Sequence, residues 1–251
     1  MKSLSAHTQY ESLKNKKVLI SGGTTGLGRA IALRLSAEGA KVFIFGRHQE
    51  QLDDALRDIR QNDPGALGMV ADASRREDLR RVFEMVDESL GGIDVLISNA
   101  ALGAEDLKST PDDEREYVLA TNIAGYLTCC RLAMLRMREH SHIILMGSVT
   151  ADNREPGGSI YVATKAAIQG FSESFRQEAM EQGIKVSLIQ PGKTGSDMVD
   201  ASPEEERESE KNLEMLKAED IAVCVEYILT QPRRCTVSQI TVLPAREPKE
   251  S

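Results

Sequence analysis

A tyrosine and a lysine stand four positions apart in the stretch Ser-Ile-Tyr-Val-Ala-Thr-Lys, residues 159–165. On a helix, side chains at this spacing emerge from one face, a turn apart. A free phenol has a pKa near ~10, and a neighbouring ammonium lowers it because it favours the phenolate. Tyr161 and Lys165 are therefore candidates for a proton-transfer pair. The alternative is an ordinary helix aromatic beside a charged neighbour, and other parts of the chain must decide between the two.

A glycine-rich turn with the sequence SGGTTGLG occupies residues 21–28, directly after an apolar run. Glycines let a backbone turn sharply and approach a ligand without a Cβ clash. The N-terminus of the helix expected to follow offers free N–H groups and a positive dipole to a pyrophosphate. We therefore expect a dinucleotide to bind through Gly22, Thr24, Thr25, Gly26, Leu27 and Gly28.

Short apolar runs alternate with longer amphipathic segments along nearly the whole chain. The runs lie at residues 17–20, 41–45, 66–70, 93–98, 142–147, 185–190 and 237–243. Three- and four-residue apolar spacing between the runs, as in Leu79, Val82 and Phe83, is typical of helices. This alternation predicts an α/β fold, a single doubly wound Rossmann-fold domain with a mainly parallel seven-stranded sheet and helices on both faces.

Two regions depart from this alternation. Residues 1–14 are polar and predict a flexible N-terminal extension, which leaves 15–251 for the Rossmann-fold domain. Residues 193–217 hold a dense acidic run. The charge run is typical of a solvated surface helix. Because the segment follows the carboxyl end of a strand, where ligands of such sheets bind, we expect part of it to cover the substrate.

Composition excludes several classes of function. Lysine and arginine total 31 against 39 acidic residues, so the formal net charge is -8. An acidic chain without a basic block is a poor candidate for binding nucleic acid or an anionic membrane. No apolar run approaches the ~20 residues of a membrane span, and the N-terminal residues do not resemble a signal peptide. The four cysteines and four histidines show no metal-ligand spacing. We expect a cytoplasmic protein without a metal site.

Several short motifs follow one another along residues 15–243. They are the Gly-x-x-x-Gly-x-Gly turn, Asp72, Ser98-Asn99-Ala100-Ala101, Asn122, Ser148, Tyr161-x-x-x-Lys165 and Pro191-Gly192 followed by Ser196. In this order the chain resembles the short-chain dehydrogenase/reductase family, in the branch of about 250 residues with a Tyr-x-x-x-Lys active site. Ser98 and Ala101 depart from the family's Asn-Asn-Ala-Gly motif, which puts the local geometry of that turn in question.

The resemblance implies a role for each matching residue. Tyr161 would be the general acid and base, tuned by Lys165, which would also bind the nicotinamide ribose. Ser148 would hydrogen-bond the substrate oxygen and polarise it, and Asn122 would hold a water that relays protons from Lys165. Read in isolation, Ser148 is a strand-end hydroxyl and Asn122 a helix-interior amide. The implied cofactor contacts beyond the glycine turn are Asp72, Ala73, Asn99, Ala100, Tyr161, Lys165, Pro191, Gly192, Thr194 and Ser196.

The turn after the second apolar run indicates which nicotinamide is used. An acid at this position would bind the adenosine ribose of NAD and repel the 2′-phosphate of NADP. The sequence here is Gly46-Arg47-His48, without a carboxylate. Arg47 offers a planar fork suited to a phosphate, although a solvated surface arginine is the alternative. We predict NADP as cofactor, with NAD as the less favoured choice.

These observations predict an NADP(H)-dependent oxidoreductase that interconverts an alcohol and a small or mid-sized aldehyde, ketone or 3-oxo acid. Residues that flank Ser148 or follow Pro191-Gly192 are candidates to contact the substrate: Val149, Thr150, Arg154, Lys193 and Met198. The alternative function is a non-catalytic NADP-binding sensor on the same fold. The resemblance also implies a homodimer or homotetramer, formed through the helices that carry Asn122 and Tyr161; we expect the former helix from about residue 112 to 138.

Overall fold

The structure is a computed structural model that describes residues 10–195 and 202–246. Its centre is a seven-stranded sheet of order β3-β2-β1-β4-β5-β6-β7, in which every neighbouring pair is parallel. The strands are β1 (Lys17–Ser21), β2 (Lys41–Gly46), β3 (Leu67–Val70), β4 (Val95–Ser98), β5 (His142–Met146), β6 (Lys185–Pro191) and β7 (Gln239–Val242). Each strand lies within one of the predicted apolar runs or extends one residue beyond it, so the predicted fold class is confirmed.

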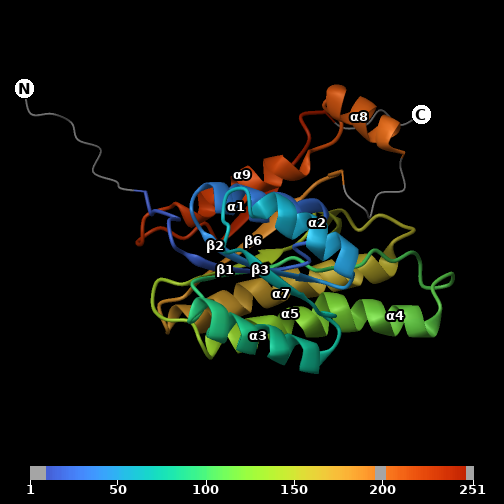
Figure 1. Ribbon diagram of the computed structural model, residues 1–251. Coiled ribbons are helices and arrows are strands. Elements are labelled where there is room, and N and C mark those ends of the chain that lie inside the picture. Colours follow the sequence, from blue (N-terminus) through green and yellow to red (C-terminus); the bar gives the residue numbers. More distant parts are fainter. Residues whose placement is uncertain (1–9, 196–201, 247–251) are drawn as a thin grey trace, which may run out of the picture.

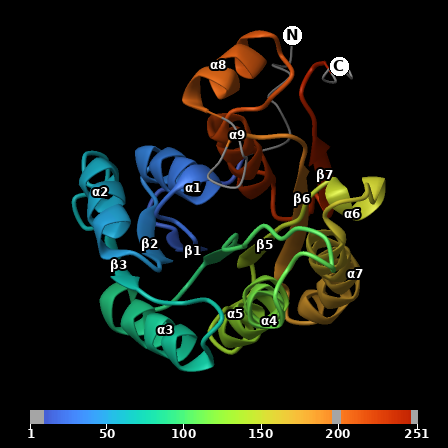
Figure 2. The same cartoon turned by 90° about the vertical axis from the view of Figure 1, so that its right-hand side faces the viewer.

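Helices cover both faces of the sheet. They are α1 (Gly26–Ala37), α2 (Gln49–Ile59), α3 (Arg76–Leu90), α4 (Asp112–Leu119), α5 (Tyr126–Met134), α6 (Thr150–Asn153), α7 (Ser159–Met180), α8 (Pro203–Lys211) and α9 (Ala218–Leu229). Figures 1 and 2 show α1, α2 and α9 on one face, and α3, α5 and α7 on the other. The strand order reverses between β1 and β4, and ligands of open α/β sheets bind at such a reversal.

The sheet separates two apolar cores. Buried side chains of α1, α2 and α9 pack on one face, and those of α3, α5 and α7 pack on the other. Central strands such as β4 and β5 are buried at every residue because both of their faces are covered. The α3 residues Leu79, Val82, Phe83 and Val86 are all buried, as their helical spacing predicts.

The helix predicted over residues 112–138 is interrupted. A π-helical segment, η1 (Ala120–Gly125), separates α4 from α5, and α5 ends at Met134. The wider turn contains Asn122, whose side chain bonds the backbone of Leu102 in both directions. Such π-helical turns recur at functional sites, where they redirect a side chain. Hydrophobic periodicity does not reveal this change of helix type.

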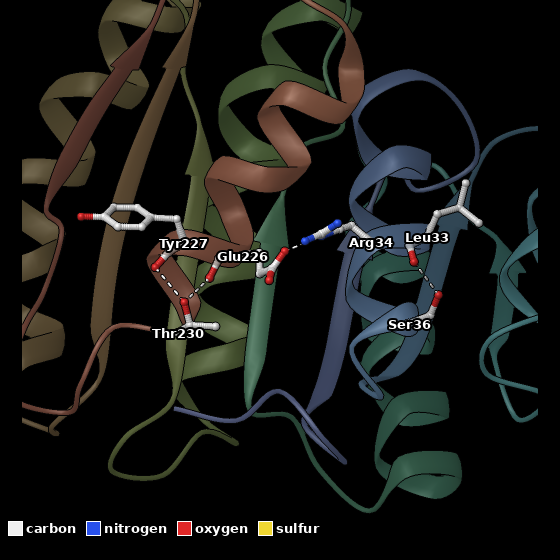
Figure 3. Close-up of polar contacts among 6 residues, drawn as sticks. All are labelled: Leu33, Arg34, Ser36, Glu226, Tyr227 and Thr230. Atoms are coloured by element: carbon white, nitrogen blue, oxygen red, sulfur yellow. Dashed lines mark hydrogen bonds and ion pairs between the residues drawn. The ribbon is translucent and has the colours of Figure 1, made fainter. Parts of the chain in front are cut away.

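Polar contacts connect the first and last parts of the chain. Arg34 of α1 forms an ion pair with Glu226 of α9, while the Tyr227 side chain points away from it (Figure 3). Of the predicted N-terminal extension, residues 1–9 lie outside the described residues. Beyond them, Leu13 is buried and Glu11 N donates to Thr230 O at 2.9 Å. These contacts fasten the chain to the end of α9.

The two ends of the acidic segment pair with each other directly after β6. Thr194 and Leu216 form an isolated parallel bridge, and Leu216 N donates to Lys193 O at 2.9 Å. Between them, α8 begins with a capping box in which Ser202 and Glu205 exchange hydrogen bonds. Figures 1 and 2 show α8 beyond α9, on the α1 side of the sheet. The predicted surface helix is thus present; the covering role of the segment stays a prediction.

Candidate active site and cofactor cleft

The glycine-rich turn joins β1 to α1 at the carboxyl edge of the sheet. Gly22 has a φ of +62°, and a Cβ on it would lie 2.9 Å from Ala100 Cα. A Cβ on Gly28 would lie 2.0 Å from Gly22 O, closer than the backbone can tolerate. These two glycines therefore allow the turn to fold back on itself and the β4 loop to approach it closely.

A hydrogen-bonded clamp holds the turn against the loop after β4. Asn99 Nδ2 donates to Ser21 O at 3.1 Å and to Gly22 O at 3.2 Å. In return, Ser21 Oγ accepts from Asn99 N at 2.8 Å and from Ala100 N at 3.0 Å. Sequence reasoning did not select Ser21 as a site residue, although it stands directly before the first glycine. The Ser98 hydroxyl, at one of the two family departures, is buried without a hydrogen-bond partner among the described residues.

A cleft of about 480 Å³ opens beside this turn. Its lining includes most of the predicted cofactor contacts: Gly22, Thr24, Thr25, Gly26, Leu27, Arg47, Asp72, Ala73, Asn99 and Ala100. Sequence reasoning missed other lining residues, among them Gln51, Leu102 and Thr121. Gly28 lies against Gly22 instead of lining the cleft. The cleft thus combines a backbone turn, a guanidinium and a carboxylate, which suits the diphosphate, phosphate and purine parts of a dinucleotide.

Two charged residues of the cleft are joined through a tyrosine that the sequence did not single out. Arg47 Nη1 donates to Tyr117 Oη at 2.8 Å, and this hydroxyl donates to Asp72 Oδ2 at 2.8 Å. Asp72 Oδ1 also accepts from Ser74 N at 2.8 Å. The three residues come from the ends of β2 and β3 and from α4. The pairing requires the fold, because Arg47 and Tyr117 stand 70 positions apart.

Asn122 connects the cleft with the helix that carries the tyrosine and lysine. Its Oδ1 accepts from Leu102 N, and its Nδ2 donates to Leu102 O, both at 2.8 Å. Nδ2 also lies 3.2 Å from Oγ1 of Thr164 on α7. The Asn122 amide therefore positions the loop around Leu102, which lines the cleft. The water relay implied for Asn122 stays a prediction.

Ser148, Tyr161 and Lys165 gather at the carboxyl end of β5, and none of the three is among the residues that line the cleft. Lys165 Nζ donates to Met146 O at 2.9 Å, two residues before Ser148. Ser148 Oγ lies 2.8 Å from Thr150 Oγ1 and accepts from Thr150 N at 3.2 Å. A hydrogen bond also links Ser148 with Tyr161. A serine hydroxyl, a phenol and an ammonium thus converge from the β5 end and α7.

The expected lowering of the Tyr161 pKa is wrong for the protein alone. Burial raises the pKa of Tyr161 to about 12, although its hydrogen bond with Ser148 opposes the shift. Burial also lowers the pKa of Lys165 to about 8. The Lys165 ammonium lies 5.6 Å from the ring centroids of both Tyr126 and Tyr161. Desolvation disfavours the phenolate, so Tyr161 holds its proton at neutral pH.

The remaining predicted residues differ in burial and position. Pro191 and Gly192 lie at the carboxyl end of β6, where Val149 N donates to Pro191 O at 3.1 Å. Thr194 is buried and donates to Gly192 O, while Lys193 is exposed. Arg154 is exposed as well, and its Nε donates to Ala151 O at 3.1 Å. Two predicted contacts, Ser196 and Met198, lie outside the described residues.

No group of three or more histidine, cysteine, aspartate or glutamate side chains is arranged to hold a metal ion in the described part of the chain. Nor do the described residues include a helix both long and apolar enough to cross a membrane.

Comparison with known proteins identifies the family. A family model described as short chain dehydrogenase matches residues 16–207. An uncharacterized oxidoreductase of Listeria monocytogenes is 30% identical over 248 residues, covering 94% of this chain and 99% of that relative. An uncharacterized oxidoreductase of Staphylococcus aureus is 30% identical over 235 residues, covering 92% and 98%.

Solved structures agree with this assignment. A short chain dehydrogenase from Burkholderia cenocepacia in complex with NADP superposes with a TM-score of 0.85 at 27% identity, covering 93% of this chain and 98% of that one. A dehydrogenase/reductase from Sinorhizobium meliloti has a TM-score of 0.81 at 28% identity, with 92% and 95% coverage. With a matching model over most of its length and a dinucleotide-type cleft beside its tyrosine and lysine, this chain belongs to the short-chain dehydrogenase family of oxidoreductases, which bind a nicotinamide cofactor.

Proposed function

We propose that the protein is an NADP(H)-dependent oxidoreductase that interconverts a small or mid-sized aldehyde, ketone or 3-oxo acid and the corresponding alcohol. The observation that carries this proposal is the convergence of Ser148, Tyr161 and Lys165 at the carboxyl end of β5. These groups supply a hydrogen-bond donor for a carbonyl oxygen, a phenolic acid and a cation. A binding module would gain nothing from burying an ammonium, because burial disfavours the charged form.

In carbonyl reduction, Tyr161 acts as general acid. Its raised pKa keeps the phenol protonated at neutral pH, so the proton is available when negative charge develops on the substrate oxygen. Ser148 donates a hydrogen bond to the same oxygen and polarises the carbonyl. The reduced nicotinamide, when bound, supplies the hydride. In the reverse direction the Tyr161 phenolate accepts the proton of the alcohol as hydride leaves for the oxidised nicotinamide, and the nearby Lys165 ammonium stabilises that phenolate before the transfer.

Replacing Tyr161 with phenylalanine tests this mechanism because it removes only the hydroxyl. We expect kcat for carbonyl reduction to fall by about 10²–10⁴, with the Kd for NADPH nearly unchanged. Tyr227→Phe is the matched control, since it removes an exposed hydroxyl on α9 and should leave both quantities unaltered. Near-normal turnover by Tyr161→Phe would exclude the phenol as the acid.

The cleft fits an NADP cofactor. Its lining includes Gly22, where a side chain would collide with Ala100. It also includes Arg47, which directly follows β2 at a position where no carboxylate stands. The NADP complex of the Burkholderia cenocepacia relative supports the same choice. Arg47 would bind the 2′-phosphate, Asp72 the purine amine, and the N-terminus of α1 the diphosphate.

The Arg47→Asp variant tests the choice of cofactor. The new carboxylate would repel the 2′-phosphate and accept hydrogen bonds from an unphosphorylated ribose. We expect the ratio of kcat/KM for NADPH to that for NADH to fall by at least about tenfold. Wild-type protein that used NADH as efficiently as NADPH would refute the proposed preference.

The substrate would lie between Ser148 and the loop after β6. Of the expected contacts, Val149 and Thr150 adjoin Ser148, and Lys193 follows the β6 end. Arg154 would require its exposed side chain to turn toward this region. A panel of aldehydes, ketones and 3-oxo acids, followed by NADPH absorbance, identifies the substrate class. Cofactor binding with no turnover on any member would favour a sensor instead.

We also infer a cytoplasmic homodimer or homotetramer. The support is a pair of exposed leucines, Leu119 and Leu127, on the helices that flank Asn122. Apolar side chains at such positions favour burial against a second copy. Light scattering of the purified protein gives the copy number directly, and a monomer at all concentrations would refute this assembly.

A further inference from the structure

One phenol connects the two charged residues at the adenosine end of the cleft. Tyr117 Oη accepts a hydrogen bond from Arg47 Nη1 and donates one to Asp72 Oδ2, each at 2.8 Å. The guanidinium carbon also lies 5.7 Å from the centroid of the Tyr117 ring, within the range of a cation–π contact. Cation, phenol and carboxylate thus form a continuous chain from β2 through α4 to the loop after β3.

This chain of bonds has a defined direction. The phenol must keep its proton to donate to Asp72 while its oxygen accepts from Arg47. Partial burial favours that state, since it raises the pKa of Tyr117 above its usual value. Hydrogen bonds arranged from a cation to an anion polarise one another, so the central phenol strengthens both contacts.

Tyr117 supports the two cleft residues from behind. Arg47 and Asp72 line the cleft, whereas Tyr117 is not among the lining residues. A guanidinium has five N–H groups, and the phenol takes one of them. A carboxylate offers about four acceptor sites, of which Tyr117 and Ser74 N occupy two. Both groups therefore retain hydrogen-bonding capacity on their cleft side, for a phosphate and for a purine amine.

We propose that Tyr117 is a positioning residue that determines NADP selectivity by holding the exposed Arg47 guanidinium at the cleft, in register with Asp72. The proposal rests on the proposed use of NADP. An unrestrained arginine loses much rotamer freedom when it binds a phosphate. The Tyr117 hydroxyl imposes that restriction before the cofactor arrives, so binding loses less entropy. NADH lacks the 2′-phosphate and gains little from a fixed guanidinium.

The test is cofactor binding by Tyr117→Phe, measured by titration of the protein without substrate. This variant keeps the ring beneath Arg47 and removes both hydrogen bonds. We expect the Kd for NADPH to rise by about three- to tenfold and the Kd for NADH to change by less than about twofold. Tyr227→Phe serves as the control and should change neither Kd. A Tyr117 role limited to general stability would weaken both cofactors equally, which would overturn the proposal.

A double-mutant cycle distinguishes positioning from direct contact. If Tyr117 acts through Arg47, then Tyr117→Phe should change the NADPH Kd by less than about twofold in an Arg47→Ala background. An undiminished effect in that background would show that Tyr117 does not act through Arg47. Tighter NADPH binding by Tyr117→Phe would mean that the phenol competes with the cofactor, and would also overturn the proposal.

The outcomes separate this inference from the proposed function. If Arg47→Ala weakens NADPH binding and Tyr117→Phe does not, only the role of Tyr117 fails. If Arg47→Ala leaves NADPH binding unchanged, the proposed 2′-phosphate site fails and the inference fails with it.

Discussion

Strand β5 carries a buried polar residue at its amino end and leads into a second polar group at its carboxyl end. At the amino end, His142 Nε2 bonds Ser187 Oγ at 2.7 Å, and Ser187 Oγ donates to Val237 O at 2.6 Å. At the carboxyl end, Ser148 lies near Tyr161 and Lys165. Both ends belong to the sheet, but the polar groups at the amino end bond within the protein, whereas those at the carboxyl end form the candidate active site.

The difference lies in what the polar groups face. The cavity at the amino end has a volume of about 30 Å³, against about 480 Å³ for the cleft at the carboxyl end. Burial lowers the pKa of His142 to about 3, so the ring is neutral, and its Nε2 is hydrogen-bonded to Ser187 Oγ. Lys165 is as deeply buried but faces the Tyr161 phenol. A buried titratable group thus indicates a functional site where other side chains capable of proton transfer adjoin it.

The largest expected effect is on kcat/KM, and it should distinguish two lysines at opposite edges of the sheet. Lys165→Met should lower kcat/KM for carbonyl reduction by about 10²–10⁴, because the phenolate loses its cation. It should also raise the thermal midpoint, since the lowered Lys165 pKa shows that burial disfavours its charge. Met146 O would retain the hydrogen bond from Tyr126 Oη.

The matched variant at the amino end is Lys185→Met. Lys185 Nζ donates to Pro232 O at 3.0 Å and to Cys235 O at 2.7 Å. Its loss should leave kcat/KM nearly unchanged, so the two substitutions should differ in their effect on activity although burial lowers the pKa of both lysines. Equal loss of activity in both variants would contradict the assignment of function to one end.

The next largest effect is expected at the glycine turn. Gly28→Ala places a Cβ against the Gly22 backbone, so the turn must shift. Such overpacking costs about 1–3 kcal/mol, and we expect the NADPH Kd to rise by at least about fivefold. Gly170→Ala on α7 is the control, since a Cβ there has nothing within 4 Å. It should leave the Kd unchanged and stabilise the helix by about 0.5–1 kcal/mol. An unchanged NADPH Kd in Gly28→Ala would contradict a role of this turn in binding the cofactor.

The smallest effect is a pH dependence of stability at the amino end. The folded-state pKa of His142 is about 3, below its ordinary value of 6.5, so between these values the unfolded chain binds a proton that the folded chain does not. His142 should therefore lower the free energy of unfolding as pH falls below 6.5, by up to about 1.4 kcal/mol per pH unit. Urea unfolding between about pH 6.5 and 5, where most carboxylates remain ionised, measures this slope.

The His142→Gln variant sharpens that measurement. Glutamine can donate to Ser187 Oγ as the imidazole does, but it does not titrate. We expect its stability to vary less with pH across the same window. An identical slope in both proteins would assign the pH dependence to other groups.

Much of the fold could be predicted because it depends on local pattern. All seven strands overlap apolar runs, and the central strands do so because strands buried on both faces require nearly continuous apolar residues. The buried face of α3 could likewise be predicted from the helical spacing of its apolar residues. The interruption at η1 could not be predicted in this way, because Asn122 of that segment bonds the backbone of Leu102, which lies 20 positions away in the sequence.

The sequence by itself determined the chemistry available at the carboxyl edge: a glycine turn after β1, the Tyr161 and Lys165 pair, and Arg47 at the end of β2. The tertiary structure alone decided how these groups are held and charged. It placed Tyr117 between Arg47 and Asp72, made Ser21 a support of the turn, and raised the pKa of Tyr161 where spacing predicted a decrease. The physical reason is that burial and these hydrogen bonds arise between residues distant in sequence, and desolvation depends on everything packed around a group.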